Sequence, residues 1–169
     1  IMSYLYEMHA HVKEVSTCSP TSAKEFVSLY TDTDYTGIVL TDHMNSDTFT
    51  KRGLGDAQWD KKIDHFLTGY KAVKEAAGDK LIVIMAMEIH FYHNPNDYLV
   101  YGVTEDFLRS HGGLMAMGAK KFSELAKENG VIFIQAHPFR RDSLVTHWRL
   151  LDGYEIFNGN PRHYSCNPM

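Results

Sequence analysis

The sequence predicts an α/β protein whose sheet is largely parallel, either closed into a barrel or left open. Short apolar or aromatic runs of strand length alternate with segments of helical periodicity, and strands that alternate with helices form largely parallel sheets. In addition, five of the six predicted strands end in a histidine, a carboxylate or an amide. With 169 residues, 44% of them hydrophobic, residues 1–169 are expected to form a single domain with its own core.

The first half of the chain contains three predicted strands and two predicted helices. The strands cover residues 4–8, 38–40 and 81–87. The third of them is a continuous apolar run, which is typical of a strand covered on both faces. A helix is expected to begin around Pro20, because proline is favoured in a first turn. A second helix is expected from Trp59 to about Ala77, where apolar residues recur at spacings of three and four, and the polar residues 44–55 are expected to form a loop.

The second half of the chain repeats the alternation. Its strands are predicted over residues 98–103, 131–136 and 154–157. A turn formed by residues 94–97 precedes the first of them. A helix is expected from Gly118 to Asn129, with Gly130 as its stop, and a shorter one over residues 143–150.

Histidine and carboxylate side chains collect where the predicted strands end. These strand-end groups are His9 and His11, His43, Glu88 and His90, His137, and Asn158. In parallel α/β folds the catalytic groups lie at the carboxyl ends of the strands, whereas structural histidines are scattered along strands and helices. Other histidines fit such structural positions, namely His65, His111, His147 and His163. Since imidazole and carboxylate groups are common ligands of divalent ions, the strand-end set predicts a metal site.

Composition excludes several other classes of protein. The formal net charge of −4 argues against binding nucleic acid through a basic surface, so nucleic acid is not an expected partner. No apolar run approaches the roughly 18–20 residues of a membrane span, and none resembles a signal peptide. Cys18 and Cys166 are too few for a disulfide framework. We therefore expect a cytoplasmic protein without a membrane partner.

A series of short motifs resembles the PHP (polymerase and histidinol phosphatase) family. In order, the motifs are His9-Ala10-His11, Thr41-Asp42-His43, Met87-Glu88, Ala136-His137-Pro138 and Tyr154-Glu155-Ile156-Phe157-Asn158. They extend over nearly the whole chain, and their order and spacing make the set more specific than any one motif. The resemblance implies a distorted (β/α)7 barrel of PHP type, here lacking its last strand.

The resemblance also implies a ligand set and an activity. Two or three divalent ions, Zn, Mn or Fe, would be bound. His9, His11 and Glu88 would hold one ion, Glu88 and His137 a second, and His43 would contribute to a third. The implied activity is that of a phosphoesterase, which hydrolyses a small-molecule phosphoester through a metal-activated hydroxide.

Two departures from the family pattern affect these expectations. The family usually ends with a Gly-Ser-Asp-x-His-like motif on a seventh strand, and this chain has none, so a C-terminal segment is expected to be missing. The family also often has a histidine ligand after the position of Glu88. Here His90, His93 or Asp97 would replace it, or the ligand is absent; His90 and His93 could equally belong to a surface turn. Glu14 is a further candidate ligand, although its position three residues after His11 is not the usual position of the family's early acid ligand.

The chemistry of the residues also favours a metal-dependent hydrolase, independently of the family resemblance. Glu88 follows the most apolar strand, where a carboxylate could bridge two ions and offset part of their repulsion. Glu88, His137 and Arg140 are the expected catalytic residues. Arg140 and Arg141 could bind phosphate, or could form a solvated helix start. A metal-dependent amide or lactone hydrolase, and a metal-binding module without catalysis, remain as alternatives.

Overall fold

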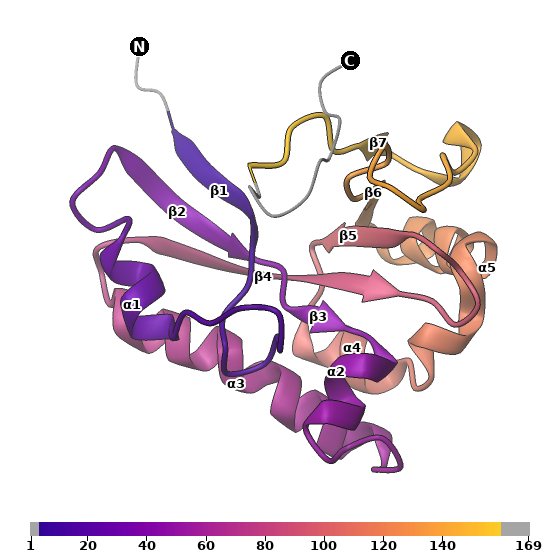
Figure 1. Cartoon of the computed structure of the whole chain (residues 1–169), viewed down its shortest axis with the longest axis horizontal. Coiled ribbons are helices and arrows are strands. Elements are labelled where there is room, and N and C mark those ends of the chain that lie inside the picture. Colours follow the sequence, from indigo (N-terminus) through magenta and orange to yellow (C-terminus); the bar gives the residue numbers. More distant parts are fainter. Residues whose placement is uncertain (1–3, 160–169) are drawn as a thin grey trace.

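The computed structural model of the chain describes residues 4–159. In this part of the chain the strands form one mixed sheet of order β1-β2-β4-β5-β6-β7, and β3 pairs with β4. The strands are β1 (Leu5–Ala10), β2 (Tyr35–Leu40), β3 (His43–Met44), β4 (Ile82–His90), β5 (Asp97–Tyr101), β6 (Ile132–Gln135) and β7 (Gly153–Tyr154). In Figure 1 the sheet curls from β1 and β2 on the left, through β4, to β6 and β7 on the right.

This sheet is a curled half-barrel, so the prediction of a distorted (β/α)7 barrel lacking its last strand is wrong, although the broader α/β class is confirmed. Between β4 and β5 only residues 91–96 are available, and a crossover between parallel neighbours needs a dozen or more. β5 therefore runs antiparallel to both β4 and β6, while the pairs β1–β2, β2–β4 and β6–β7 are parallel. Within residues 4–159, β1 and β7 do not pair with each other.

The two long helices, α3 and α5, lie close to their predicted positions, whereas the short helices differ from the prediction. They are α1 (Ala23–Ser28), α2 (Ser46–Lys51), α3 (Trp59–Ala77), α4 (Glu105–Ser110), α5 (Leu114–Asn129) and the 3-10 turn η1 (Trp148–Leu150). α2 lies within the predicted loop because the Asn45 side chain caps it, and Thr104 caps α4 in the same way. α5 begins before Gly118, which forms a kink with φ 73°. Of the helix predicted over residues 143–150, only η1 is helical.

Helix α3 connects the two hydrophobic clusters of the core. Its first half buries Ile63, Phe66 and Leu67 among residues of β4, β5 and α5. Its second half buries Val73 and Ala77 among residues of β1, β2 and α1. Figure 1 shows α1 and α3 on the same side of the sheet, where they contact each other. Each fully buried large side chain contributes roughly 1.5–3 kcal/mol, so this apolar stripe holds both halves of the sheet together.

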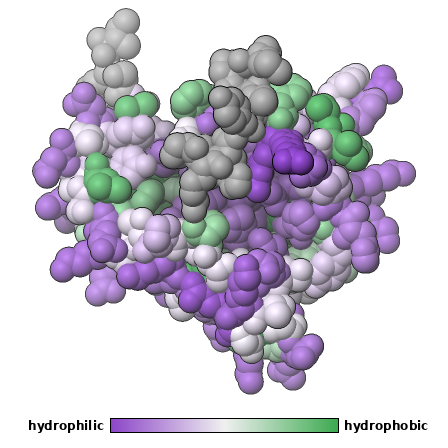
Figure 2. Space-filling view, in the orientation of Figure 1, coloured by the Kyte–Doolittle hydropathy of each residue, from purple (hydrophilic) through white to green (hydrophobic). Residues whose placement is uncertain are grey.

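The face of the molecule seen in Figure 2 is largely polar. Figure 2 shows hydrophilic groups over much of the viewed face, with apolar side chains scattered among them. Two exposed apolar side chains, Ile156 and Phe157, follow β7 and border the cavity described below. In the part of the chain that the structure describes, no helix has both the length and the apolar character needed to cross a bilayer.

Gly69 of α3 lies where any larger residue would collide with Asp42, which follows β2, and would crowd the loop that follows β1. A Cβ atom at this position would overlap Asp42 Oδ2 and would lie 3.0 Å from Val15 Cγ2. We expect Gly69→Ala to lower the free energy of unfolding by about 2 kcal/mol, because overpacking costs about 1–3 kcal/mol and outweighs the gain in helix propensity. Denaturant unfolding followed by circular dichroism measures this change.

The matched control is Thr68→Ala, one residue earlier on the exposed side of α3. Its free energy of unfolding should change by about 0.5 kcal/mol or less, as for most surface substitutions. Equal stability of Gly69→Ala and the parent would show that α3 can shift away from Asp42 at no cost.

Candidate metal centre

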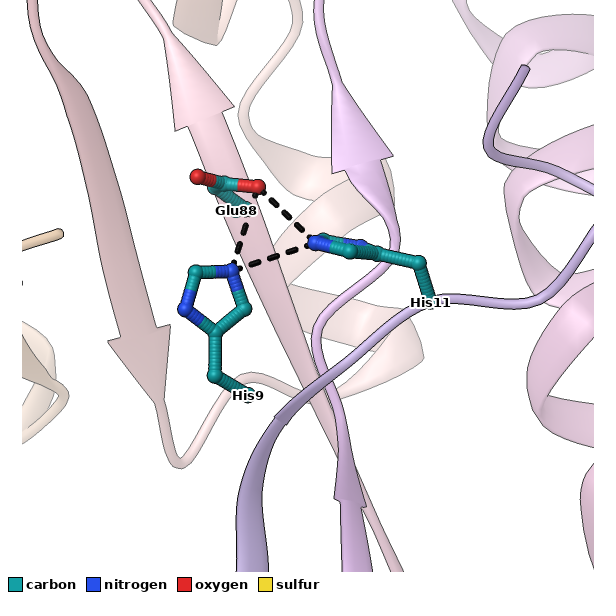
Figure 3. Close-up of side chains that lie close together, drawn as sticks. All are labelled: His9, His11 and Glu88. Atoms are coloured by element: carbon teal, nitrogen blue, oxygen red, sulfur yellow. Dashed lines mark hydrogen bonds and ion pairs between the residues drawn. The ribbon is translucent and has the colours of Figure 1, made fainter. Parts of the chain in front are cut away.

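His9 and His11 direct their rings toward one carboxylate, that of Glu88 (Figure 3). His9 lies in β1 and His11 directly after it, and residues two apart on an extended chain face the same side. Parallel pairing of β1 with β2, and of β2 with β4, brings these elements together. Glu88 lies within β4, where it is paired with His43 of β3 and Leu99 of β5. A central strand therefore holds the carboxylate that both histidines face.

The separations between these three donor atoms fit a single metal ion. His9 Nε2 is 3.1 Å from His11 Nε2, and the two nitrogens lie 3.4 and 3.2 Å from Glu88 Oε2. In a tetrahedral zinc site with bonds of about 2.0–2.1 Å, the ligand atoms lie about 3.4 Å apart. Two histidines and one carboxylate also match the ligand types of catalytic zinc sites, which keep one coordination position open.

The other oxygen of Glu88 contributes to a second group of possible ligands. Glu88 Oε1 lies 3.1 Å from His137 Nε2, and His137 Nε2 lies 3.8 Å from Asp97 Oδ2. The donor atoms of these three residues all lie within 4.8 Å of one another. Glu88 is thus shared between two groups, as a carboxylate that bridges a pair of ions must be. The His9, His11 and Glu88 set is called the first group below, and the Glu88, Asp97 and His137 set the second group.

Burial and the neighbouring histidines act in opposite directions on the pKa of Glu88. The residue is only 1% exposed, and burial by itself would raise the pKa. His43 and His9 oppose this effect and hold the pKa of Glu88 well below its usual range. The same contacts act on His9, because burial lowers its pKa while Glu88 and Glu155 raise it to about 10. Glu88 is therefore ionised at neutral pH, the state in which it can bind cations.

His43 lies beside the first group but is a member of neither group. Its Nδ1 is 3.3 Å from Glu88 Oε2, and its ring stacks on that of His11 with centroids 4.5 Å apart. The backbone N–H of His43 donates to the Ser16 hydroxyl, which in turn donates to the buried Asp42 carboxylate. The third ion expected at His43 stays a prediction, since both possible metal groups among residues 4–159 form without it.

Glu14 lies against α1 and belongs to neither group. Both of its carboxylate oxygens accept the backbone N–H of Ala23, the first residue of α1, at 3.0 and 3.1 Å. A carboxylate in this position satisfies a free helix N–H and interacts favourably with the helix dipole. The structure therefore gives Glu14 a capping contact.

Of the three candidates for the ligand after Glu88, Asp97 is the one that joins the second group. His90 lies at the end of β4, and its Nδ1 is 2.8 Å from Asp97 Oδ1. His90 therefore orients Asp97 without being a member of either group. His93 lies in the connection between β4 and β5, with a φ of 58°.

Arg140 lies at the edge of the second group. One of its guanidinium nitrogens is 3.5 Å from His137 Nε2 and 3.8 Å from Asp97 Oδ2. Arg141, in contrast, directs an almost fully exposed side chain into solvent beside Asp142. Only the first of the two arginines is therefore placed to meet a ligand at the candidate site.

The loop that carries Arg140 is fastened to the sheet by two buried amides. The Asn96 side chain accepts the N–H of Leu144 at 2.8 Å and donates to its carbonyl oxygen. The Gln135 side chain likewise donates to Leu144 and accepts the N–H of Thr146. Because both amides are buried, these bonds fix the far end of the loop relative to β5 and β6.

Both groups border one cavity of about 940 Å³. Arg140 and Asn45 contribute polar groups to its wall, and Tyr101, Ile134 and Phe157 contribute apolar surface. Cavities that bind small molecules are commonly of this size and combine apolar walls with a few polar groups.

Two carboxylates of the site were not assigned as ligands from the sequence. Asp97 was one of several alternatives, and Glu155 was noted only as part of the last strand motif. Glu155 is 9% exposed and lies 2.7 Å from His9 Nδ1. The sequence offers no clear signal for Glu155, because it follows the short strand β7 and its neighbours Ile156 and Phe157 are exposed.

No protein-family model matches this chain, and no match was found among curated proteins. The resemblance to the PHP family is therefore a hypothesis that depends on the motifs. The support for a function comes from the geometry of the residues themselves.

Proposed function

We propose that this protein is a metal-dependent hydrolase that cleaves a phosphoester at a centre of two divalent ions. The observation that carries the proposal is the position of Glu88, whose buried carboxylate gives one oxygen to each of two ligand groups. The side chains of His9, His11, His43 and His137 face this carboxylate, and their nitrogens together with its oxygens form a suitable donor set for a pair of cations. The motif resemblance to the PHP family points to the same class of enzyme.

The residues of the two groups have distinct tasks in this proposal. His9, His11 and Glu88 would hold the first ion, and Glu88, Asp97 and His137 would hold the second. When bound, such ions lower the pKa of a bound water and neutralise charge that develops on phosphoryl oxygens. The mixed nitrogen and oxygen donors suit Zn, Mn or Fe.

Arg140 gives the centre its preference for phosphoesters. Its guanidinium carries a fixed charge and a planar set of donors that match two phosphate oxygens. The bonds of Asn96 and Gln135 to residues 144 and 146 fix the far end of the loop that carries it. A small-molecule phosphoester is therefore the proposed substrate, and the low cysteine content supports a cytoplasmic enzyme.

A reconstitution experiment tests this proposal. The metal-free protein is loaded with Zn, Mn or Fe and assayed on phosphomonoesters, phosphodiesters, amides and lactones. We expect turnover of a phosphoester, two bound ions per chain, and no turnover in the metal-free protein. Turnover of amides or lactones alone would replace the proposal with a carbonyl hydrolase, and two bound ions without any turnover would indicate a binding module.

Arg140→Ala should raise KM for the phosphoester about tenfold or more with a smaller effect on kcat, because a charged hydrogen bond contributes about 1.5–3 kcal/mol. Arg141→Ala is the matched control, since that side chain is exposed, and its KM should equal the parent's. Equal KM values for both variants would remove Arg140 from the phosphate site.

A further inference from the structure

Glu155 contacts both groups of the candidate metal centre from the segment that follows β7. Its Oε1 lies 2.7 Å from His9 Nδ1, and its Oε2 accepts the backbone N–H of His137 at 2.7 Å. Asn158 donates to both oxygens at 3.2 Å. One carboxylate thus joins a residue of the first group to a residue of the second.

The contact with His9 determines which ring nitrogen can bind an ion. A carboxylate only accepts hydrogen bonds, so His9 Nδ1 must carry the proton that it shares with Glu155. In the neutral ring His9 Nε2 then keeps its lone pair, and this nitrogen is the one that faces His11 and Glu88. Among the described residues, the Nδ1 atoms of His11 and His137 have no hydrogen-bond partner. Within the two groups, His9 is therefore the histidine whose ring is oriented by a second residue.

The contact with His137 acts on the backbone. His137 has a φ of 28°, in the left-handed region that residues with a side chain rarely adopt. The bond from its N–H to Glu155 is buried and involves a charged acceptor, which makes it stronger than a neutral bond. This bond holds the backbone in the conformation from which the His137 ring reaches Glu88.

We propose that Glu155 is a positioning residue that couples the two ion positions, by fixing the His9 ring at one and the His137 backbone at the other. The inference rests on the proposed metal centre. Carboxylates that orient a ligand histidine are common around metal ions, and their loss typically weakens metal binding about 10–100-fold. Because Glu155 serves both groups, its loss should weaken both ions together.

Glu155→Gln is the sharpest test, because the amide keeps the shape of the carboxylate but has one acceptor and one donor group. Either the His9 contact or the His137 contact must then face an NH2 group, and the other contact is made to a neutral oxygen, which is a weaker acceptor than a carboxylate. We expect Zn²⁺ affinity, measured by competition with a chelator, to fall about 10–100-fold for both bound ions. Glu14→Gln is the matched control, because Glu14 contacts α1, and its affinities should equal the parent's.

Nuclear magnetic resonance separates positioning from a general loss of structure. In the zinc-loaded parent, the ¹⁵N signals of His9 should report a metal-bound Nε2 and a protonated Nδ1 that exchanges slowly. In the metal-free parent, the amide proton of His137 should lie far downfield, as expected for a short bond to a carboxylate. Both signatures should be lost or reduced in Glu155→Gln while the circular dichroism spectrum stays unchanged.

Should Glu155→Gln fail to fold, Glu155→Asp provides the same readouts, since the shorter side chain keeps the charge but cannot reach both partners. The inference is overturned if the folded variant binds both ions within twofold of the parent, or keeps both signatures. A parent protein that binds no Zn²⁺ would instead overturn the metal centre itself, and the inference with it.

Discussion

Glu88→Gln should remove most of the bound metal and lower phosphoesterase turnover by several orders of magnitude, on the scale of losing metal activation. Glutamine has one neutral oxygen and one NH2 donor, so it cannot bridge two cations or offset their repulsion. Both groups would lose their shared member, and metal content should fall by more than one ion per chain. Metal analysis and steady-state kinetics on the same preparations measure both effects.

Two further variants serve as controls for this experiment. His43→Gln should be milder, because His43 lies beside the first group and is a member of neither. Glu14→Gln should leave metal content unchanged. All three proteins should fold, since the core is formed by the apolar residues of β4 and α3. Full metal content and full turnover in Glu88→Gln would make Glu88 a structural carboxylate and would move the centre elsewhere.

Metal affinity should rise steeply with pH, because the first ion must displace a proton from His9. The pKa of His9 is raised to about 10 in the metal-free protein, so its ring is an imidazolium at neutral pH and cannot bind an ion. Apparent affinity should therefore increase about tenfold per pH unit above neutrality until the pKa is reached. Chelator competition between pH 6.5 and 8.5, together with calorimetry in two buffers of different ionisation enthalpy, measures the slope and the proton released.

The same shift predicts how the stability of the metal-free protein depends on pH. A histidine whose pKa is higher in the folded than in the unfolded state stabilises the fold below the unfolded pKa of 6.5. This contribution is lost as the pH rises toward about 10. His93→Gln is the control, because that residue lies in the turn after β4. Its free energy of unfolding should depend on pH as strongly as that of the parent.

In the calorimetry described above, metal binding that releases no proton at pH 7 would contradict the raised pKa of His9.

Local sequence patterns were sufficient to select residues that the fold brings together, but not to order the strands. His9, His11, Glu88 and His137 were selected because each lies near the end of an apolar run, and the structure brings all four together. Such a pattern indicates which residues are buried and where a strand ends. It does not indicate which strands are neighbours in the sheet, so periodicity could not predict the antiparallel direction of β5 or the half-barrel.

The carboxylates illustrate a second limit. Glu14 follows His11 closely in sequence, yet its carboxylate accepts the backbone N–H of Ala23 and lies outside both groups. Glu155 is 146 residues from His9, and only the path of the folded sheet makes them neighbours. An acid near a histidine in sequence is therefore a weak indicator of a shared site, because the fold decides which groups become neighbours.

The four strands that supply the candidate ligands would affect when a metal ion can bind. His9 comes from β1, Glu88 from β4, Asp97 from β5 and His137 from the end of β6. Contacts between residues so far apart in the chain form late in folding, since the intervening chain must be ordered first. A nascent chain that ends before β6 holds at most the first group. By mass action, ions that bind only the native state would stabilise the completed sheet.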